Sequence, residues 1–452
     1  MSDLLHDAYQ RAVSYQTTLD NRPVFPATDV LAALTVFDEP LPTASVSPED
    51  TLALLDAYGS PATVASTGHR YFGFVTGGAL PVTIAANWLA TAWDQNGALH
   101  ATSPIVAKLE AVALRWLVEI FGLPEGTGGA FVSGATLANF TALAAARHAL
   151  LMREGWDVEA QGLFGAPEIR VVVSDEVHVS VLKALSLLGL GRERVIRVPT
   201  DAQGRMRADS LPPLDARTIV CIQSGNVNSG AFDPAEAICH AAHAAGAWVH
   251  VDGAFGLWAL AAPELAHLGA GISQADSWVV DGHKWLNVPY DSGLAFVRDG
   301  AHLAGAMSTT AAYLMTGDQR EPSHYVPEFS RAARAVDVWA ALRTLGKAGL
   351  ADLITRTCRY ARRFAEALTA AGYTVHNDVI LNQVVVSFGD AERTQAVINA
   401  IQSEGTLWAG RTVWHGHTAM RISVSSWATT DDDVETSLAA ILRIAESIDQ
   451  RA

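Results

Sequence analysis

The stretch Ser277-Trp278-Val279-Val280-Asp281-Gly282-His283-Lys284-Trp285 decides the fold of this chain. It begins as a short apolar run, which is typical of a strand buried on both faces of a parallel sheet. Lys284 follows at the end of that strand, behind a glycine and beside a histidine. A solvated lysine rarely lies there, and lysine becomes a Schiff-base nucleophile when partial burial lowers its pKa. The alternative is a lysine at the sheet edge whose ammonium group reaches water.

Similar runs recur along the chain and alternate with Ala- and Leu-rich helices. The predicted strands are Ala130–Val132, Ile169–Ser174, Val195–Val198, Thr218–Gln223, Trp248–Asp252, Ser277–Val280 and Gly293–Arg298. Alternation of strand and helix predicts an α/β fold with a mostly parallel, doubly wound sheet. In such a sheet ligands bind just beyond the carboxyl ends of the strands. The side chains at those ends are therefore the first candidates for chemistry.

Three parts are expected along the chain. Residues 1–80 are helical with repeated proline breaks and form an arm, residues 81–336 form a large α/β domain, and residues 337–452 form a smaller α/β domain. The run Thr429-Thr430-Asp431-Asp432-Asp433 is expected to cap the last helix, because acidic side chains there face the positive end of the helix dipole.

Composition narrows the class of protein. The 452 residues include 31 basic and 47 acidic side chains, a formal charge of −16, which disfavours nucleic acid and anionic membranes as partners. The N-terminus lacks the features of a signal peptide, and no apolar stretch is long enough to span a membrane. Three scattered cysteines do not predict a disulfide framework. We therefore expect a soluble cytoplasmic protein. The pairs around Cys239 and His415 lack further ligands, so no metal site is expected.

A carboxylate ends the strand before the lysine. Asp252 is followed by Gly253 and Ala254, small residues that leave room for a flat ring. The pyridine ring of pyridoxal phosphate (PLP) needs an anion beside its nitrogen, because the protonated ring is the electron sink that stabilises a carbanion. A neighbouring opposite charge favours the ionised form by roughly 1–3 pKa units. The alternative is an aspartate that merely starts a strand-to-helix turn.

Two further strand ends supply groups that suit this cofactor. Ser133 and Gly134 lie between a predicted strand and an Ala-rich helix, Leu137–Ala146, whose first N–H groups could bind a phosphate. His283 could add another donor. His178 closes another strand and could stack on the cofactor ring, or it could simply start a helix. Each signal is modest alone, but four of them at strand ends, in this order, together indicate a PLP site.

The order of these motifs resembles the group II PLP-dependent amino acid decarboxylases, which have the fold type I architecture of PLP-dependent transferases. The resemblance runs from about His69 to Trp427. It implies a large PLP domain with a mostly parallel sheet, a smaller C-terminal domain and a homodimer with shared active sites. It implies that Lys284 holds the cofactor as a Schiff base. The other cofactor contacts that it implies are Ser133, Gly134, His178, Asp252, Ala254, Asp281 and His283.

The resemblance also implies a substrate cleft for a small amino acid. Arg421 matches a family arginine near the substrate and is a candidate partner for a carboxylate. Phe74 would line the cleft, and the segment that begins at Trp93 would reach it from the other subunit. Both aromatic side chains favour an aromatic or apolar substrate, although both could equally be ordinary core residues.

The sequence departs from the family pattern in two places. The segment 224–233 replaces a Gly-Thr-Thr turn, and Asn226 or Asn228 could hydrogen-bond as the threonines do. The loop before Arg331 places a proline at or near the position of the tyrosine that protonates Cα in the family. His324 and Tyr325 follow it and are the candidate catalytic acids. Relatives without that tyrosine are aldehyde-forming synthases.

We therefore expect a PLP-dependent decarboxylase that converts an L-amino acid to its amine, with an aromatic side chain slightly favoured. An oxidative, aldehyde-forming deaminase is the alternative because of the altered loop. A non-catalytic ligand-binding relative of the fold is the alternative of another class. Another PLP reaction, such as transamination, would use the same cofactor residues.

Overall fold

The computed structural model describes residues 2–309 and 319–450. The chain divides into two compact units. The large unit comprises residues 77–362 and 377–383, and the small unit comprises residues 1–76, 363–376 and 384–452. The division into three parts that we expect from the sequence is drawn on composition rather than on contacts, and it stays a prediction.

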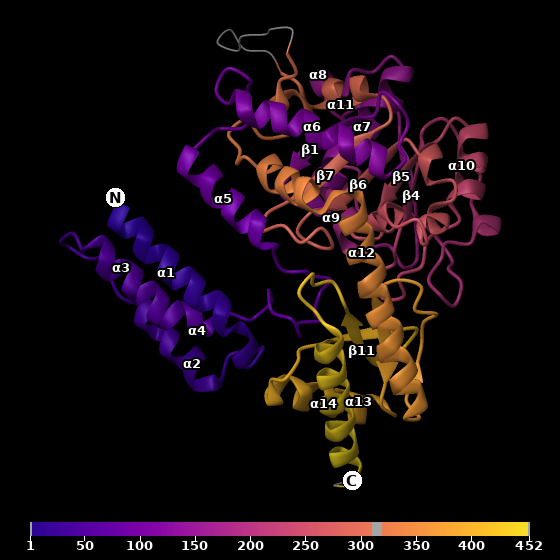
Figure 1. Ribbon diagram of the computed structural model, residues 1–452. Helices are drawn as coiled ribbons and strands as arrows, with labels where there is room; N and C mark the ends of the chain where they lie inside the picture. The colour runs from indigo at the N-terminus through magenta and orange to yellow at the C-terminus, as the bar shows by residue number, and fades with distance from the viewer. Residues whose placement is uncertain (1, 310–318, 451–452) are drawn as a thin grey trace. The chain divides into compact units, whose positions relative to one another are not determined.

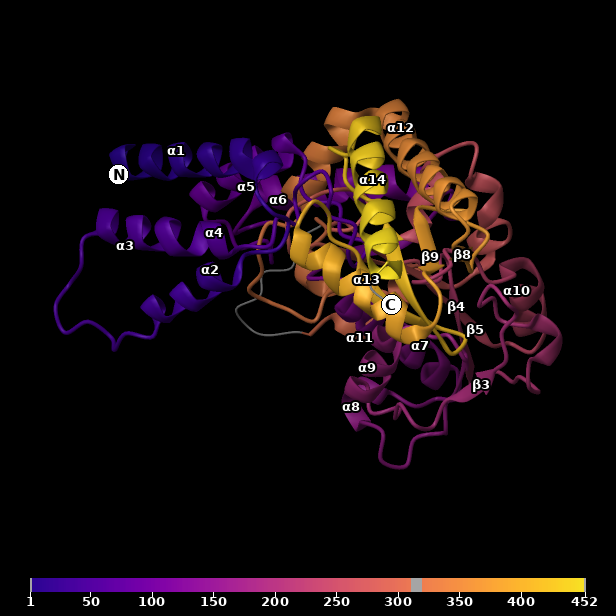
Figure 2. The same cartoon turned by 90° about the horizontal axis from the view of Figure 1, so that it is seen from below.

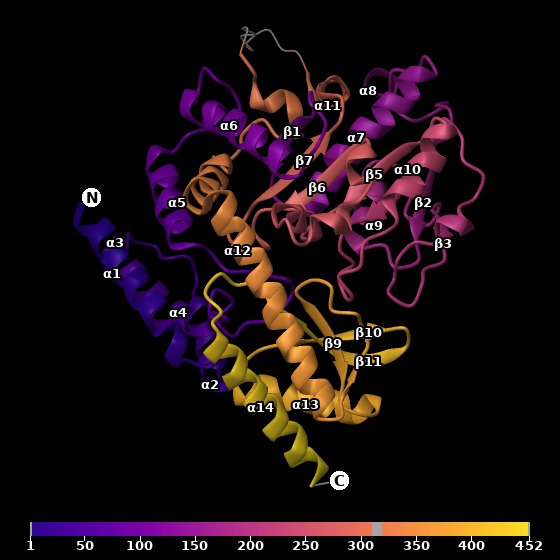
Figure 3. The same cartoon turned by 45° about the vertical axis from the view of Figure 1, so that its right-hand side comes forward.

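A seven-stranded sheet forms the centre of the large unit within the described residues. Its strands are β1 (Gly128–Val132), β2 (Arg170–Ser174), β3 (Ile196–Val198), β4 (Thr218–Gln223), β5 (Trp248–Asp252), β6 (Ser277–Asp281) and β7 (Gly293–Val297). Their spatial order is β1-β7-β6-β5-β4-β2-β3, and Figure 3 labels all of these strands except β4. Only β7 runs antiparallel to its neighbours, β1 and β6. All seven predicted strands are confirmed, with ends that differ by at most two residues.

Helices cover this sheet. They are α5 (Pro81–Trp93), α6 (Pro104–Ile120), α7 (Ala135–Arg153), α8 (Val158–Gln161), α9 (Val179–Leu187), α10 (Ala235–Ala244), α11 (Gly300–Met307) and the first part of α12 (Ala335–Ala370). The short 3-10 helices are η4 (Ala208–Ser210), η5 (Gly256–Ala261), η6 (Ala266–Gly269), η7 (Ile272–Gln274) and η8 (Pro322–Tyr325). Helix α7 packs across β5, β6 and β7 and against α9 and α11 (Figure 1). Its many alanines let its backbone approach the sheet closely. The helix is longer than the predicted Leu137–Ala146, because the apolar pattern continues through Leu150 and Leu151.

The small unit contains a four-stranded sheet among the described residues, in the order β10-β11-β9-β8. Its strands are β8 (Thr374–Val375), β9 (Gln383–Ser387), β10 (Gly410–Trp414) and β11 (His417–Ser423). Helices α13 (Ala391–Glu404) and α14 (Asp431–Asp449) pack side by side, and α13 contacts β11 (Figure 1). The side chains of Thr430 and Asp433 form a capping box at the start of α14, which confirms the predicted cap.

The N-terminal helices belong to the small unit because the segment that follows them pairs with it. The Phe72 N–H donates to the Trp408 carbonyl at 2.8 Å, and the Ser423 N–H donates to the Phe72 carbonyl at 2.9 Å. Asp433 forms ion pairs with His69 and Arg70, each at 3.3 Å. The helices themselves are α1 (Ser2–Thr18), η1 (Leu19–Asn21), α2 (Thr28–Ala32), η2 (Ala33–Phe37), α3 (Pro48–Leu54), η3 (Leu55–Gly59) and α4 (Ser60–Ala62) (Figure 2).

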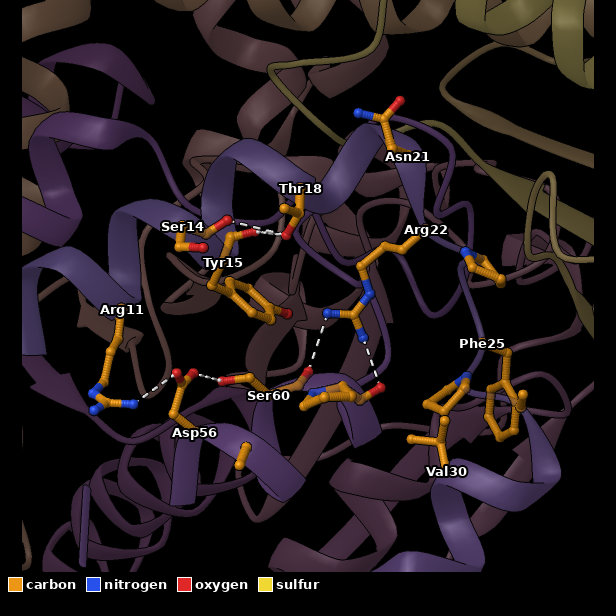
Figure 4. A pocket seen from close by; sticks show the side chains of 15 residues that line it. Arg11, Ser14, Tyr15, Thr18, Asn21, Arg22, Phe25, Val30, Asp56 and Ser60 are labelled. Carbon is orange, nitrogen blue, oxygen red and sulfur yellow. Dashed lines mark hydrogen bonds and ion pairs between the residues drawn. The ribbon is translucent and has the colours of Figure 1, made fainter. Parts of the chain in front are cut away.

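A cavity of about 580 Å³ lies among these N-terminal helices (Figure 4). Arg11 binds Asp56 at 3.1 Å, and Ser60 donates a hydrogen bond to the same carboxylate at 2.7 Å. Arg22 donates to the carbonyl oxygens of Ser60 and Pro61. The dashed lines in Figure 4 show that these side chains bind groups of the same N-terminal segment. The cavity is therefore a feature of helix packing, and its lining contains none of the residues that the sequence predicts for chemistry.

Candidate active site

Lys284 lies in a buried cluster at the end of β6. Its Nζ is 3.0 Å from Oδ2 of Asp281, the last residue of the strand. The Nε2 atom of His283 is 3.6 Å from the same oxygen. The Asp281 side chain is only 2% exposed, whereas that of Lys284 is 21% exposed, so the amine lies at the rim of the buried region. The turn after Asp281 brings the side chains of Asp281, His283 and Lys284 together, whereas a continued strand would have kept them apart.

The protonation of His283 follows from its partners. The Ser292 N–H donates to His283 Nδ1 at 3.2 Å, so Nδ1 is an acceptor. Burial lowers the pKa of His283, and the nearby Asp281 carboxylate opposes that change only in part. A neutral ring with its proton on Nε2, facing Asp281, satisfies both contacts. The Tyr290 ring stacks on the His283 ring, with centroids 4.4 Å apart.

Buried aromatic side chains hold the backbone around the lysine. The Trp285 indole N–H donates to Thr357 Oγ1 at 2.9 Å, and the Trp258 indole N–H donates to the Asp281 carbonyl at 2.9 Å. Both indoles are fully buried. A Cβ on Gly282 would lie 2.4 Å from Ser292 Oγ, so only glycine fits between the strand and the lysine. These contacts fix the position from which the amine projects.

The start of α7 lies against this cluster. Gly134 is its N-cap residue and offers no side chain to the first-turn N–H groups. A Cβ on Gly134 would lie 3.2 Å from His283 Cε1, and a Cβ on Gly293 would lie 2.4 Å from Gly134 Cα. Glycine at both positions therefore lets the helix start, β7 and His283 meet. The half-buried Ser133 precedes them, and the N–H groups of a helix start bind anions such as phosphate.

Asp252 ends β5 and is 5% exposed. Its Oδ1 accepts from the Ala254 N–H at 3.1 Å, and its Oδ2 accepts from Asn139 Nδ2 at 3.3 Å. His178 is the N-cap residue of α9, where its Nδ1 accepts from the Ser180 N–H. The sequence reasoning missed Asn139 and Ser180. A lone amide in an otherwise apolar, Ala-rich helix was the signal that could have indicated Asn139.

Several buried polar atoms in this region have no hydrogen-bond partner among the described residues: Asp281 Oδ1, Ser292 Oγ, Ser224 Oγ and Asn226 Nδ2. The Oδ1 atom of Asn226 instead accepts from the N–H groups of Asn228 and Ser229, which stabilises the turn that replaces the family pattern. The free N–H groups of the helix start, Lys284 and these unpaired polar atoms supply donors and acceptors for a polar ligand with an anionic group. The residues present therefore fit the phosphate and the other polar groups of PLP.

The two candidate acids of the loop lie in η8. The Tyr325 ring lies 4.2 Å from the guanidinium carbon of Arg320, which binds the buried Glu110 at 2.7 Å and the Gly129 carbonyl at 2.6 Å. Tyr325 also packs against the apolar cluster around α7 and α11. These contacts hold its ring beside the first half of β1, whereas the start of α7 follows the other end of that strand. His324 is half-buried beside it. Their catalytic roles stay predictions.

The predicted substrate residues are divided between the units. Phe74 and Arg421 lie in the small unit, and Trp93 is the last residue of α5 in the large unit. The Phe74 ring stacks on Trp408 with centroids 5.5 Å apart and is 64% exposed. Burial lowers the pKa of Arg421 to about 10. Its role toward a substrate carboxylate stays a prediction.

A cavity of about 280 Å³ lies beside Tyr290. Asp337 lines it and is 7% exposed, with Oδ2 accepting from Asn87 Nδ2 at 2.9 Å and Oδ1 unpaired among the described residues. Burial raises the pKa of Asp337 to about 6, and the Asn87 hydrogen bond opposes the rise. The cavity is polar, and its buried carboxylate weakens the fold when it ionises.

Replacing Asp337 with asparagine is expected to stabilise the fold at high pH. Because the folded-state pKa lies above the unfolded value, the wild type gains protonation on folding and loses stability as pH rises from about 4 to 6. The penalty above pH 6 is about 2–3 kcal/mol, so Asp337→Asn should raise the apparent Tm by about 2–6 °C at pH 8 and hardly at all at pH 4. Thermal denaturation at both pH values checks this. Asp390→Asn, at the exposed N-cap of α13, is the control, and an equal shift at both pH values would contradict the assignment.

Two further observations concern metal binding and membrane insertion. Among residues 2–309 and 319–450, no group of three or more His, Cys, Asp or Glu side chains is placed to hold a metal ion. His243 instead pairs with Asp276 at 3.1 Å, and His417 stacks on His376. In the same residues, no helix has both the length and the apolar character to cross a membrane.

Comparison with known proteins identifies the family. Residues 47–388 match the pyridoxal-dependent decarboxylase conserved domain. The chain is 28% identical over 388 residues to tryptophan decarboxylase 1 of Oryza sativa subsp. japonica, covering 80% of this chain and 75% of that protein. It is 26% identical over 366 residues to phenylacetaldehyde synthase of Arabidopsis thaliana, covering 74% and 73%.

A solved structure has the same fold. The crystal structure of Oryza sativa TDC with PLP and tryptamine matches with a TM-score of 0.91, at 24% identity, over 99% of this chain and 97% of that chain. The fold type I architecture and the resemblance drawn from the motifs are thus both confirmed. The chain therefore belongs to the pyridoxal-dependent decarboxylases, and it is an amino acid carboxy-lyase whose cofactor is pyridoxal phosphate.

Proposed function

We propose that this enzyme decarboxylates an L-amino acid to its amine at the site around Lys284, with an aromatic side chain slightly favoured. The observation that carries the proposal is the cluster of Lys284, Asp281 and His283 at the end of β6, beside the start of α7. Asp252 ends the neighbouring strand of the same sheet. The chemistry is therefore assigned to residues of the large unit.

The residues present would divide the binding of the cofactor among them. Ser133, Gly134 and His283 would hold the phosphate at the start of α7, where donors are not used by a capping side chain. Asp252 would hold the ring nitrogen as an ion pair. His178 would stack on one face of the ring and Ala254 would lie under the other. Asp281 would orient Lys284. When bound, PLP supplies an electron sink for the bond that breaks at Cα.

Lys284 has two tasks in this proposal. Its amine would hold the cofactor, and as a free ammonium group it would pair with the buried Asp281 carboxylate, 3.0 Å away. A neutral His283 beside it adds no competing positive charge. These residues thus hold the lysine near the reacting carbon in both forms.

The small unit offers groups for the substrate itself. The rings of Tyr71 and Phe74 both stack on Trp408, which gives a cluster of aromatic surface. Such a surface suits an aromatic side chain, and tryptophan decarboxylase 1 is among the similar proteins. Arg421 is the candidate partner for a substrate carboxylate, and Trp93 is expected to act from the partner subunit.

A homodimer is proposed as well. Many large apolar side chains of the N-terminal helices and of α5 are exposed in the single chain: Leu5, Tyr9, Val13, Leu31, Phe37, Leu55, Tyr58, Trp88, Leu89 and Trp93. Exposed large apolar side chains in such number are typical of a protein–protein interface. A second copy covering these helices would bury these side chains, and sedimentation of the purified protein tests this directly.

The second candidate function is an oxidative reaction that forms an aldehyde. It would consume one oxygen and one water per substrate and release carbon dioxide, ammonia and hydrogen peroxide with the aldehyde. It is favoured by the position of Tyr325, whose ring is held on Arg320 beside β1. Phenylacetaldehyde synthase is also among the similar proteins. A product assay of the PLP-loaded enzyme with all twenty amino acids, following carbon dioxide, amine, aldehyde and peroxide, separates the two functions.

Substitutions in η8 are expected to show which side chain delivers the proton to Cα. Because the ring of Tyr325 is anchored on Arg320, Tyr325→Phe should leave the ratio of amine to aldehyde unchanged. His324→Gln should lower amine formation by at least about 10-fold, within the 10²–10⁴-fold contribution usual for a general acid. The ratio is measured at saturating substrate. A Tyr325→Phe variant that made mainly aldehyde would assign the proton to the tyrosine instead.

A further inference from the structure

A chain of buried hydrogen bonds joins the far end of β6 to Asp252. The Trp248 indole N–H donates to Ser277 Oγ at 2.9 Å, and Ser277 Oγ is 2.8 Å from His250 Nδ1. His250 Nε2 is 2.8 Å from Asn139 Oδ1, and Asn139 Nδ2 donates to Asp252 Oδ2 at 3.3 Å. The side chains of Asn139, His250 and Ser277 are 0% exposed. This chain crosses β5, β6 and α7 without contact with solvent.

The direction of donation follows from the Asp252 end. The Asp252 oxygen accepts from Asn139 Nδ2, so the Asn139 Oδ1 faces His250 Nε2 and accepts from it. The imidazole proton of His250 is therefore on Nε2, and its Nδ1 accepts from the Ser277 hydroxyl, which itself accepts from the Trp248 indole. The two N–H bonds of Asn139 consequently point toward Asp252 Oδ2 and Ser180 Oγ, 3.3 and 3.2 Å away.

The same reasoning extends to His178. The Ser180 backbone N–H donates to His178 Nδ1, so this nitrogen carries no proton and can only accept from Ser180 Oγ. His178 Nδ1 lies 2.7 Å from it and Asp252 Oδ2 lies 3.5 Å from it, so the nearer nitrogen is the better acceptor. The Ser180 backbone N–H also points to His178 Nδ1, at 3.3 Å. With two donors on Nδ1, His178 carries its proton on Nε2.

The charge of His250 agrees with this direction of donation. Burial lowers the pKa of His250 to about 4, and the Asp252 carboxylate opposes the change only in part. The imidazole is therefore neutral at working pH and has one N–H, as the direction of donation requires. Asp252 accepts one hydrogen bond from Asn139 and another from the Ala254 N–H, so a donor orients each of its two oxygens.

We propose that Ser277, His250 and Asn139 are positioning residues that keep Asp252 an oriented, ionised acceptor and fix the tautomer of His178. The inference rests on the proposed role of Asp252 as partner of the pyridine nitrogen. Three buried side chains, all outside the turn that carries Lys284, would thus set the charge beside the pyridine ring. We call this chain of hydrogen bonds from Ser277 to Asp252 the relay. Ser277 lies opposite His250, and Asp252 lies two residues further along β5, opposite Val279, so the relay acts over roughly 7 Å of strand.

Asn139→Asp tests the step next to the carboxylate. The variant keeps the shape and the acceptor for His250, but it replaces the donor to Asp252 with an oxygen about 3.3 Å away, so the two carboxyl groups must share a proton. We expect PLP affinity to fall at least about 10-fold and the absorption spectrum of the bound cofactor to change its pH dependence. Titration of the apoenzyme with PLP and spectra from pH 6 to 9 measure both, and an unchanged affinity and spectrum would overturn the proposal.

Ser277→Ala tests the remote end. Without the hydroxyl, His250 can move its proton to Nδ1, and Asn139 can then flip and present its oxygen to Asp252. The expected result is a fall in PLP affinity of roughly 5- to 20-fold, the cost of one unsatisfied buried group. Ser174→Ala is the matched control, a buried serine at the end of β2 that hydrogen-bonds Gln223 and lies outside the relay. Equal spectra and affinities for Ser277→Ala and the wild type would refute the relay.

A parallel titration of Asp252→Asn separates the two levels of the argument. If Asp252→Asn weakens PLP binding but Ser277→Ala and Asn139→Asp do not, the relay is wrong and the proposed role of Asp252 stands. If Asp252→Asn itself binds PLP with the wild-type affinity and spectrum, the proposed role fails and the relay fails with it. Thermal denaturation of each apoenzyme confirms that the variants being compared are folded.

Discussion

Lys284→Ala is expected to abolish turnover. The substitution removes the amine that we propose anchors the cofactor. It also leaves the buried Asp281 carboxylate without its partner at 3.0 Å. Loss of proton transfer alone lowers rates by about 10²–10⁴-fold, and loss of the covalent anchor adds to it. Turnover of the PLP-loaded variant should therefore fall below detection in a carbon dioxide assay.

A second measurement distinguishes the role of the Lys284 amine from that of its positive charge. Borohydride reduction of the wild type loaded with PLP should attach the cofactor to the peptide that contains Lys284, as mass spectrometry would show. Lys284→Arg keeps a positive charge near Asp281 but cannot form the bond, so it should be as inactive as the alanine variant. Lys347→Ala, an exposed lysine paired with Glu119, is the control and should match the wild type. Labelling at another lysine, or turnover by Lys284→Ala, would contradict the assignment.

The sheet could be predicted from the sequence because its signals are local. Each buried strand is a short apolar run between turns, so its position can be recognised without knowledge of its neighbours. The site follows from the same pattern. In a parallel sheet the carboxyl ends of the strands share one edge, and this places Asp252 near Asp281 and Lys284 as soon as both strands are assigned.

The parts that could not be predicted depend on partners that are distant in the sequence. Asn139 binds Asp252, which lies 113 residues further along the chain, and neither residue alone indicates the other. The pairing of Phe72 with Trp408 and Ser423, which ties the N-terminal helices to the small unit, also leaves no local pattern. The position of Tyr325 is set by Arg320 and the buried Glu110. A loop without periodicity gives no means of anticipating such an anchor.

Asp252→Asn is expected to lose most of the activity while keeping the fold. Asparagine has nearly the same shape and can still accept the hydrogen bond from the Ala254 N–H, so the structure at the end of β5 should persist. What is lost is the negative charge. An ion partner favours the protonated ring nitrogen by roughly 1–3 pKa units, so its removal should lower kcat by about 10- to 10³-fold. Asp252→Ala removes the hydrogen bonds as well and should lose more.

Comparison of these variants shows whether Asp252 acts through its charge or through its shape. If Asp252 acted only as a structural acceptor, Asp252→Asn would retain near wild-type kcat and only Asp252→Ala would lose activity. If it acts through its charge, both variants are impaired, and kcat falls more than KM rises, because the charge stabilises the transition state more than the bound substrate. Asp299→Asn, at the exposed N-cap of α11, is the matched control and should keep wild-type kinetics. Steady-state kinetics at saturating PLP distinguish the two cases. We expect Asp252 to act through its charge, because it is buried beside an oriented donor and has no cationic partner of its own among the described residues.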